Sequence, residues 1–295
     1  MDAETYPVAQ WGIERALARA VPVRSFPHHD PDALRRQLQQ DAHRPLRPLV
    51  VADGFCPGCG RPAPIAAYLE SARAFGGQLL LDDTQALGIL GQVPEPDLPY
   101  GRGGGGSLRW SRVGGTDVLV GSSLAKGFGV PIAVLAGSTT LLQRFVATSE
   151  TRVHSSPPSV AVIHAAEYAL AVNQARGDAL RLYLVQVIRR FRSRLTAAGF
   201  SAVGGLFPVQ TLTSIPKLDA PLLHERLLRL GVRTVLRRGH NGHTPCISFL
   251  ITARHTLQDI DRAVALLAKA AGARADCIRP VASMARRGIS HKDSA

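Results

Sequence analysis

Apolar runs in the first half of the chain alternate with helix-length amphipathic segments. Runs rich in Leu and Val at 48–52, 78–82, 117–120 and 132–136 predict strands. Because these runs are continuous rather than alternating with polar residues, we expect the strands to be buried on both faces. The segment 65–75, between the first two runs, has the pattern of a helix. This order of elements predicts an α/β fold on a mostly parallel sheet.

The second half of the chain opens with a long helical segment after Pro157 and Pro158. Gly199 offers a stop for it. Six residues repeat at helical spacing and predict one apolar face, with arginines on the remainder. They are Leu180, Leu184, Val187, Ile188, Phe191 and Leu195. Such a helix can lead from one domain into the next.

Shorter elements follow the long helix. Patterns at 209–214, 232–236 and 246–252 predict strands, and 221–230 predicts a helix. A final helix is predicted after the capping-box-like segment 256–259. We therefore expect a large domain over residues 1–178, a small C-terminal α+β domain over 179–273, and a disordered tail over 274–295.

Charge and hydropathy narrow the range of partners. The formal net charge is +13, but the arginines are scattered along the sequence and aromatic residues make up only 5%. We therefore expect no nucleic-acid partner, since base recognition needs a basic stripe and stacking groups. The first twenty residues have no apolar core of signal-peptide type, and no later stretch has the length of a membrane span. The sequence predicts a cytoplasmic protein that does not bind membranes.

The four cysteines do not form a disulfide framework. Cys56 and Cys59 have the CxxC spacing of a redox or zinc half-site, but no second pair with ligand spacing follows, and Cys246 and Cys277 are isolated. We interpret the CxxC segment as a turn with incidental thiols and expect no metal site.

Lys126 is one of only four lysines, because arginine supplies nearly all of the basic residues. It follows the apolar run 117–120 within a glycine-rich stretch. A lysine amine that is shielded from solvent can become neutral and nucleophilic, whereas an arginine side chain keeps its proton. A surface lysine on a turn is the simpler interpretation of this stretch alone.

Asp82 favours a functional interpretation of Lys126, because it ends another predicted strand. Carboxyl ends of parallel strands meet at one sheet edge, where ligands bind in open α/β folds. Asp82 and Lys126 could form a structural ion pair. They also match the needs of pyridoxal phosphate, which takes an amine for its aldehyde and an anion for its ring nitrogen.

At this point the sequence resembles a known family, the α-oxoamine synthases, which are fold-type I pyridoxal-phosphate enzymes. Residues 82–91, DDTQALGILG, are similar to the family's D-[DE]-A-H-x-x-G-x-x-G motif, and 122–129, SSLAKGFG, to its T-x-x-K-x-x-G motif. Segments 26–38, 155–158 and 252–256 resemble further motifs in the family's order. The resemblance runs from Asp2 to Ala271. It implies a three-layer fold-type I large domain and a small C-terminal domain.

The resemblance also implies roles for single residues. Lys126 would hold pyridoxal phosphate as a Schiff base and move the substrate's α-proton, while Asp82 would keep the ring nitrogen protonated. Five further positions are implied to contact the cofactor. Tyr6 would stack over the ring, Thr84 would pack under it, Gln85 would bond its 3-hydroxyl, and Ser123 and Ser155 would reach the phosphate, Ser155 across a homodimer interface.

Some positions depart from the family's pattern. The motif histidine is Gln85 here, which can donate a hydrogen bond but has no acid or base function near neutral pH. The family's R-x-R pair, which grips the substrate carboxylate, corresponds to the neutral Cys246 and Ser248. Arg233, Arg237 or Arg238 could substitute, although a solvated basic face is the simpler interpretation. The family's N-terminal phosphate-binding segment has no equivalent before Tyr6, so we expect either a fragment or a shortened relative.

Taken as a whole, the sequence predicts a pyridoxal-phosphate-dependent transferase. It would act on a small amino compound by acyl transfer from an acyl-CoA or by amino-group transfer. The alternative is a non-catalytic protein, or an inactive fragment, that keeps the fold for binding or assembly.

Overall fold

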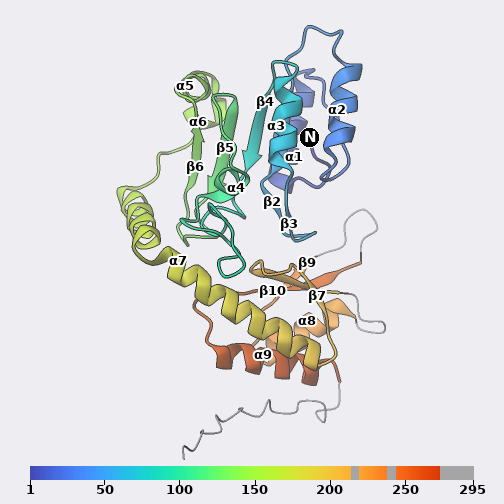
Figure 1. Cartoon of the computed structure of the whole chain (residues 1–295), viewed down its shortest axis with the longest axis vertical. Helices are drawn as coiled ribbons and strands as arrows, with labels where there is room; N and C mark the ends of the chain where they lie inside the picture. The colour runs from blue at the N-terminus through green and yellow to red at the C-terminus, as the bar shows by residue number, and fades with distance from the viewer. Residues whose placement is uncertain (214–218, 238–243, 273–295) are drawn as a thin grey trace, which may run out of the picture.

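The computed structural model describes residues 1–213, 219–237 and 244–272. Figure 1 shows two lobes joined by one long helix: an upper lobe that holds the N-terminal elements, and a lower lobe that holds β7–β10, α8 and α9.

The upper lobe is built on a four-stranded sheet of order β1-β4-β5-β6. Strands β1 (Leu49–Asp53), β4 (Gln78–Asp82) and β5 (Val118–Ser123) run parallel, and β6 (Ala133–Gly137) is antiparallel to β5. The mostly parallel sheet is therefore confirmed. All four strands lie within three residues of the ranges that the apolar runs predicted.

Strands β1 and β4 are buried on one face, whereas no residue of β6 is buried. In β4, Leu79 and Leu81 are 0% exposed, whereas Leu80 between them is half-buried. The buried face packs on α3 (Ile65–Arg73), which in turn contacts α2 (Pro31–Gln40). The expectation of burial on both faces is thus met on one side only, because these helices cover a single face.

The remaining helices of the upper lobe are short. They are α1 (Pro7–Ala18), α4 (Gly106–Ser111), α5 (Thr139–Thr148) and α6 (Glu150–Val153). A small hairpin of β2 (Phe55–Cys56) and β3 (Arg61–Pro62) follows β1, so the CxxC segment forms a turn as predicted.

Helix α7 (Val160–Ala197) is the 38-residue connection between the lobes. The side chain of Ser159 caps its first turn, and Gly199, with φ 81°, follows its end. The expected boundary after residue 178 falls within this continuous helix. Five of the six predicted apolar positions are buried, but Leu180 is 40% exposed and its neighbour Arg181 only 5%.

The lower lobe is a small α+β unit. Its antiparallel sheet has the order β7-β8-β10-β9 and carries two helices. The strands are β7 (Ala202–Val203), β8 (Val209–Leu212), β9 (Val235–Arg237) and β10 (Cys246–Leu250), and the helices are α8 (Ala220–Arg229) and α9 (Leu257–Ala270).

The final helix begins as the sequence predicts. The Thr256 hydroxyl accepts the Asp259 N–H at 3.1 Å, and the Asp259 carboxylate accepts the Thr256 N–H at 2.8 Å. This reciprocal pair is a capping box, which satisfies two backbone donors that a helix start leaves free. The tail predicted to be disordered lies outside the described residues.

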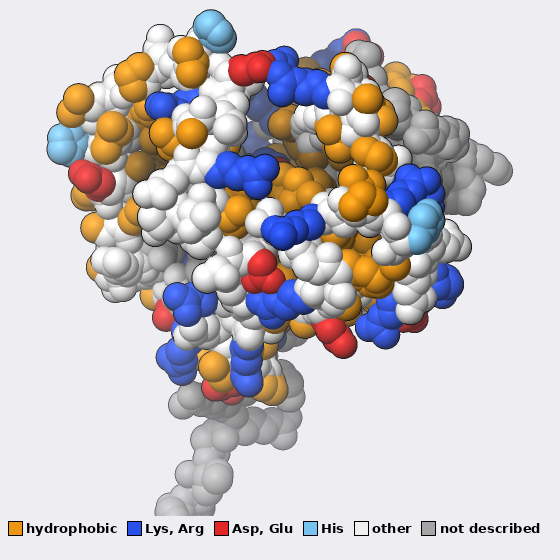
Figure 2. All heavy atoms as spheres, turned by 90° about the horizontal axis from the view of Figure 1, so that it is seen from above, with side chains coloured by type: hydrophobic (Ala, Val, Ile, Leu, Met, Phe, Trp, Pro, Cys, Tyr) orange, Lys and Arg blue, Asp and Glu red, His pale blue; other side chains and the backbone are white. Residues whose placement is uncertain are grey.

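The surface carries its positive charge in dispersed form. Figure 2 shows Lys and Arg side chains spread over one face and interleaved with hydrophobic ones, rather than gathered into a stripe. In the described part of the chain, no helix is both long enough and apolar enough to cross a membrane.

Candidate active site

Three strand ends place acidic and hydroxyl groups at one edge of the large sheet. Asp53, the last residue of β1, lies directly opposite Asp82, the last residue of β4, and Asp82 lies opposite Gly121 of β5. Because β1, β4 and β5 are parallel, their carboxyl ends meet at this edge. Ser123 ends β5, and Lys126 follows it in a turn closed by the Phe128 N–H bond to Leu124 O, 3.1 Å.

The Lys126 amine lies beside an aromatic ring and two carboxylates. Its Nζ is 4.9 Å from the centre of the Tyr6 ring. Partial burial of the amine lowers the pKa of Lys126, and the charges of Asp82 and Asp53 oppose that shift. The side chain as a whole is exposed, so a small molecule can reach it. The structure therefore brings together Lys126, Asp82 and Tyr6, which the sequence analysis selected separately.

Asp53 belongs to this cluster, and the sequence analysis missed it. Its carboxylate accepts the backbone N–H of Tyr6 at 3.0 and 3.3 Å, which fixes the start of α1 beside Lys126. Burial, followed by the charge of Asp82, raises the pKa of Asp53 to about 7. The signal was present in the sequence, because Asp53 follows the predicted strand 48–52 as Asp82 ends the next.

Thr84 and Ser123 join the strand ends through hydrogen bonds. The Thr84 N–H donates to the Asp82 carboxylate, and the Ser123 N–H donates to the Thr84 hydroxyl, both at 2.9 Å. The Ser123 hydroxyl accepts the Ala125 N–H at 3.3 Å. These bonds position the turn that carries Lys126. Gln85 lines the same cleft as Lys126.

The second acid of the motif faces away from this cluster. Asp83 is 2% exposed, and its carboxylate accepts both the backbone N–H, at 3.1 Å, and the hydroxyl of Ser107 in α4. Burial raises the pKa of Asp83 to about 6, against the hydrogen bonds from Ser107. Adjacent residues of an extended segment point to opposite sides, and the two acids follow that rule.

Ser155 is placed apart from the other selected residues. It is exposed after α6, its hydroxyl donates to Thr151 O at 2.6 Å, and it does not line the cleft that contains Lys126. Its expected role concerns a second subunit, so that role stays a prediction.

A cleft of about 960 Å³ runs from the sheet edge to the lower lobe. Its size suits a small-molecule site. The polar side chains that line it are Gln85, Lys126, Tyr168, Asn173, Arg176, Arg181, Thr252 and Arg254. Two guanidinium groups from α7 and one from the β10–α9 connection thus share the cleft with the Lys126 amine.

The two neutral positions of β10 lie among hydrogen-bonding groups. Ser248 is buried and shares a 2.7 Å hydrogen bond with Thr211. Cys246 pairs with Arg237 across β9 and β10, and the Arg237 Nε donates to its sulfur at 3.3 Å. Of the three arginines considered as substitutes, Arg237 is thus adjacent to Cys246, while Arg238 lies outside the described residues.

Curated relatives share the sequence over most of the chain. It is 30% identical over 260 residues to 8-amino-7-oxononanoate synthase of Sodalis glossinidius, covering 88% of this chain and 63% of the relative. It is 31% identical over 270 residues to the enzyme of that name from Alkalilimnicola ehrlichii, covering 88% and 64%. The chain thus spans just under two thirds of these relatives. No protein-family profile matches it.

The chain is thus similar in sequence to α-oxoamine synthases over most of its length. Solved structures agree in fold. The serine palmitoyltransferase of Sphingomonas wittichii aligns with a TM-score of 0.77 at 17% identity, covering 92% of this chain and 65% of that one. The 8-amino-7-oxononanoate synthase of Francisella tularensis aligns with a TM-score of 0.65 at 16% identity, covering 91% and 73%. The predicted fold-type I architecture is therefore confirmed.

Proposed function

We propose that the protein is a pyridoxal-phosphate-dependent transferase that forms a bond between an acyl group and an amino compound. The observation that carries this proposal is the position of the Lys126 amine, 4.9 Å from the Tyr6 ring and within the charge field of Asp82 and Asp53. The similarity to α-oxoamine synthases supports the same function. One solved serine palmitoyltransferase is described as holding the cofactor as an internal aldimine.

The residues at the sheet edge fit this cofactor. Pyridoxal phosphate needs an amine for its aldehyde, an anion for its ring nitrogen and a flat apolar surface for its ring. Lys126, Asp82 and Tyr6 offer these three groups. Thr84, Gln85 and Ser123 would complete the contacts from the same edge. When bound, the cofactor supplies an electron sink for charge that develops at the substrate's α-carbon.

The protein's own groups would divide the remaining work. Lys126 has a lowered pKa, so a larger share of its amine is neutral and able to accept a proton from the substrate's α-carbon. Asp82 would hold a proton at the cofactor's ring nitrogen. The bond from Thr84 N–H fixes the Asp82 carboxylate for that task. Tyr6, whose backbone N–H is hydrogen-bonded to Asp53, would cover the side of the cofactor ring opposite Thr84.

Substrate binding would use the cleft. An amino acid substrate carries a carboxylate, which arginine binds in a bidentate manner. Arg254 lines the same cleft as Lys126, so we assign it to that carboxylate, with Arg237 beside Cys246 as the second choice. The name of the serine palmitoyltransferase that aligns in fold supports transfer of an acyl group, and the acyl-CoA expected from the sequence would enter the same cleft.

Three further parts of the proposal concern organisation. We propose a homodimer in which Ser155 of one subunit reaches the cofactor phosphate of the other. The division into a cofactor-binding part over 1–178 and a small domain over 179–273 rests on the two lobes of Figure 1. The cytoplasmic location expected from the sequence stays a prediction.

Trapping the cofactor tests the proposal. The chain is incubated with pyridoxal phosphate and reduced with borohydride, and the labelled peptide is mapped by mass spectrometry. We expect label on Lys126 and none after Lys126→Ala, with Lys269→Ala as the matched control. Release of free CoA from a panel of acyl-CoAs and amino acids then identifies the substrates. Label elsewhere, or none, would favour the non-catalytic alternative.

A further inference from the structure

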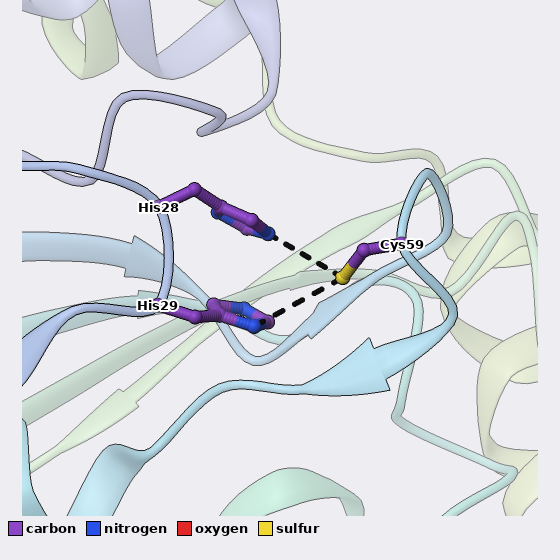
Figure 3. Close-up of side chains that lie close together, drawn as sticks. All are labelled: His28, His29 and Cys59. Atoms are coloured by element: carbon purple, nitrogen blue, oxygen red, sulfur yellow. Dashed lines mark hydrogen bonds between the residues drawn. The ribbon is translucent and has the colours of Figure 1, made fainter.

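Two histidines and a cysteine from separate parts of the upper lobe converge on one point. His28 and His29 come from the loop before α2, and Cys59 comes from the turn between β2 and β3 (Figure 3). The Nε2 of His28 lies 3.4 Å from the Cys59 sulfur, and the Nδ1 of His29 lies 3.9 Å from it. All three ligand atoms lie within 4.8 Å of one another.

These separations are close to those of a zinc centre. Zn–S bonds of about 2.3 Å and Zn–N bonds of about 2.0–2.1 Å at a tetrahedral angle put nitrogen and sulfur about 3.6 Å apart. The two observed distances lie on either side of that value. Both dashed lines in Figure 3 end on the same sulfur, and the two rings are stacked one above the other.

Asp2 fixes both histidines from behind. One of its carboxylate oxygens is 2.7 Å from the Nδ1 of His28, so the other ring nitrogen, Nε2, faces Cys59. The second oxygen accepts the backbone N–H of His29 at 3.1 Å and the hydroxyl of Tyr68 at 2.9 Å. Asp2 is only 3% exposed. A carboxylate that orients a histidine in this way is the usual outer partner of a metal-binding ring.

The backbone also favours this arrangement. His29 has φ 57°, in the left-handed region that non-glycine residues rarely occupy. That conformation lets two consecutive side chains point the same way, with ring centres 3.7 Å apart. The hydrogen bond from its N–H to Asp2 holds it there. A conformation of this kind is found where function requires it.

A fourth ligand is available in the same turn. The sulfur of Cys56 accepts the backbone N–H of Cys59 at 3.4 Å. Gly60 has φ 71° and bonds back to Cys56 O at 2.9 Å, which closes the hairpin turn. A CxxC pair on a tight turn presents two thiolates to one ion in structural zinc sites. Cys59, which the sequence analysis interpreted as incidental, therefore lies beside two nitrogen ligands that are distant in sequence, and Cys56 lies beside Cys59.

We propose that His28, His29, Cys59 and Cys56 bind one Zn²⁺ ion. The site would be structural, because it would join the loop before α2 to the β2–β3 hairpin and leave no ligand position for substrate. It shares no residue with the cluster around Lys126 and does not depend on the proposed function. Arg61 is exposed on β3, so its side chain can stay in solvent when zinc binds.

Cobalt and zinc titrations of the full chain, without an affinity tag, test the proposal. We expect one Co²⁺ per chain, with the visible bands of a tetrahedral ion and a thiolate-to-cobalt band, both displaced by one equivalent of Zn²⁺. Cys59→Ser should weaken zinc binding at least a hundredfold, measured against a chromophoric chelator. Asp2→Asn should weaken it by about 10–100-fold. Cys246→Ser is the control and should bind as the parent does.

A second measurement does not depend on variants that fold. One equivalent of zinc should protect Cys56 and Cys59 of the parent chain from alkylation, mapped by mass spectrometry, while leaving Cys246 reactive. Absence of stoichiometric binding under reducing conditions would overturn the proposal. So would a tetrahedral cobalt spectrum that survives Cys59→Ser, or an obligatory Cys56–Cys59 disulfide in place of a metal.

Discussion

Asp53 lies directly opposite Asp82 across the paired ends of β1 and β4, and the two carboxylates share the field of a single lysine, Lys126. Two like charges side by side in a half-buried site disfavour each other's ionisation. Burial, and after it the charge of Asp82, raises the pKa of Asp53 to about 7. The site is therefore sensitive to pH near neutrality even without cofactor.

The first prediction concerns Asp53 and pH. Since the folded pKa of about 7 exceeds the unfolded value of 3.8, the folded protein keeps a proton that the unfolded chain releases. The stability from this proton is complete below pH 3.8 and is lost as pH rises to about 7. After allowance for solvent screening, the loss is on the order of 1 kcal/mol. Asp53→Asn keeps an acceptor for the Tyr6 N–H and should make stability depend less on pH over this range.

Urea unfolding of the cofactor-free protein from pH 4 to pH 8 measures how its free energy of unfolding depends on pH. If the free energy of unfolding depended on pH in the same way for the parent and Asp53→Asn, the raised pKa of Asp53 would be contradicted. The variant should also lower the pKa of Lys126 further, because it removes an anion that favours the charged amine. Faster acylation of Lys126 at neutral pH, read by mass spectrometry, checks that consequence.

A second prediction compares the stability that is lost when Asp82 or its neighbour Asp83 is replaced. Asp83→Ala should destabilise the fold by about 2–4 kcal/mol, because it leaves the buried Ser107 N–H and hydroxyl without their acceptor. Asp82→Ala loses a single acceptor for Thr84 N–H in a half-buried position and should cost about 1 kcal/mol. Denaturant unfolding of both variants measures the difference.

Cofactor affinity should rank the same two variants in the opposite order. Asp82→Ala should bind pyridoxal phosphate more weakly than Asp83→Ala when each is titrated under conditions where it is folded. If Asp83→Ala were the more damaged in binding, the assignment of Asp82 to the ring nitrogen would be wrong.

Local patterns in the sequence predicted the strands of the large sheet and the site residues that end them. Asp82 and Lys126 could be brought to one edge from the sequence because parallel strands have a fixed direction. Asp53 obeys the same rule and was missed, because no motif drew attention to it. The capping box at Thr256 was predicted because all of its groups lie within four residues.

Contacts between distant segments were not predictable in this way. Arg181 has the spacing of a polar-face residue in α7, yet it is buried because it meets the Gly88 carbonyl from another part of the chain. His28 and His29 are thirty residues from Cys59, and only the packing of the β2–β3 hairpin on the loop before α2 joins them. Spacing rules describe ligands within one segment and do not find such pairs.

A third prediction concerns the contact between α7 and α9. The carboxylate of Asp261 accepts hydrogen bonds from both Arg190, at 2.7 and 2.6 Å, and Arg194, at 2.9 and 3.2 Å. Hydrogen bonds from these guanidinium groups lower the pKa of Asp261 to about 2. The stability it contributes is complete above the unfolded value of 3.8 and is lost as pH falls through about 2.

Asp261→Asn should therefore cost about 1 kcal/mol at pH 6, a value discounted for the partial exposure of all three side chains. The difference from the parent should shrink as pH falls from 4 toward 2. Thermal unfolding followed by circular dichroism measures both. A cost that stayed constant down to pH 2 would show that packing, and not the ion pairs, sets the contribution of Asp261.

The fourth prediction is that Arg181 supports the wall of the cleft. Its guanidinium donates to Gly88 O at 2.9 Å, to the Asn173 side chain at 2.7 Å and to Asp178 at 2.6 Å. Arg181→Ala should destabilise the protein by about 1–3 kcal/mol, because the half-buried Gly88 carbonyl and Asn173 side chain lose the partner that the buried guanidinium supplies. Arg176→Ala, an exposed neighbour in the same helix and cleft, should change stability by less than about 0.5 kcal/mol. Because Gly88 lies within the motif 82–91, Arg181→Ala should also weaken cofactor binding. Equal unfolding midpoints for the two variants would show that the Gly88 contact carries no stability.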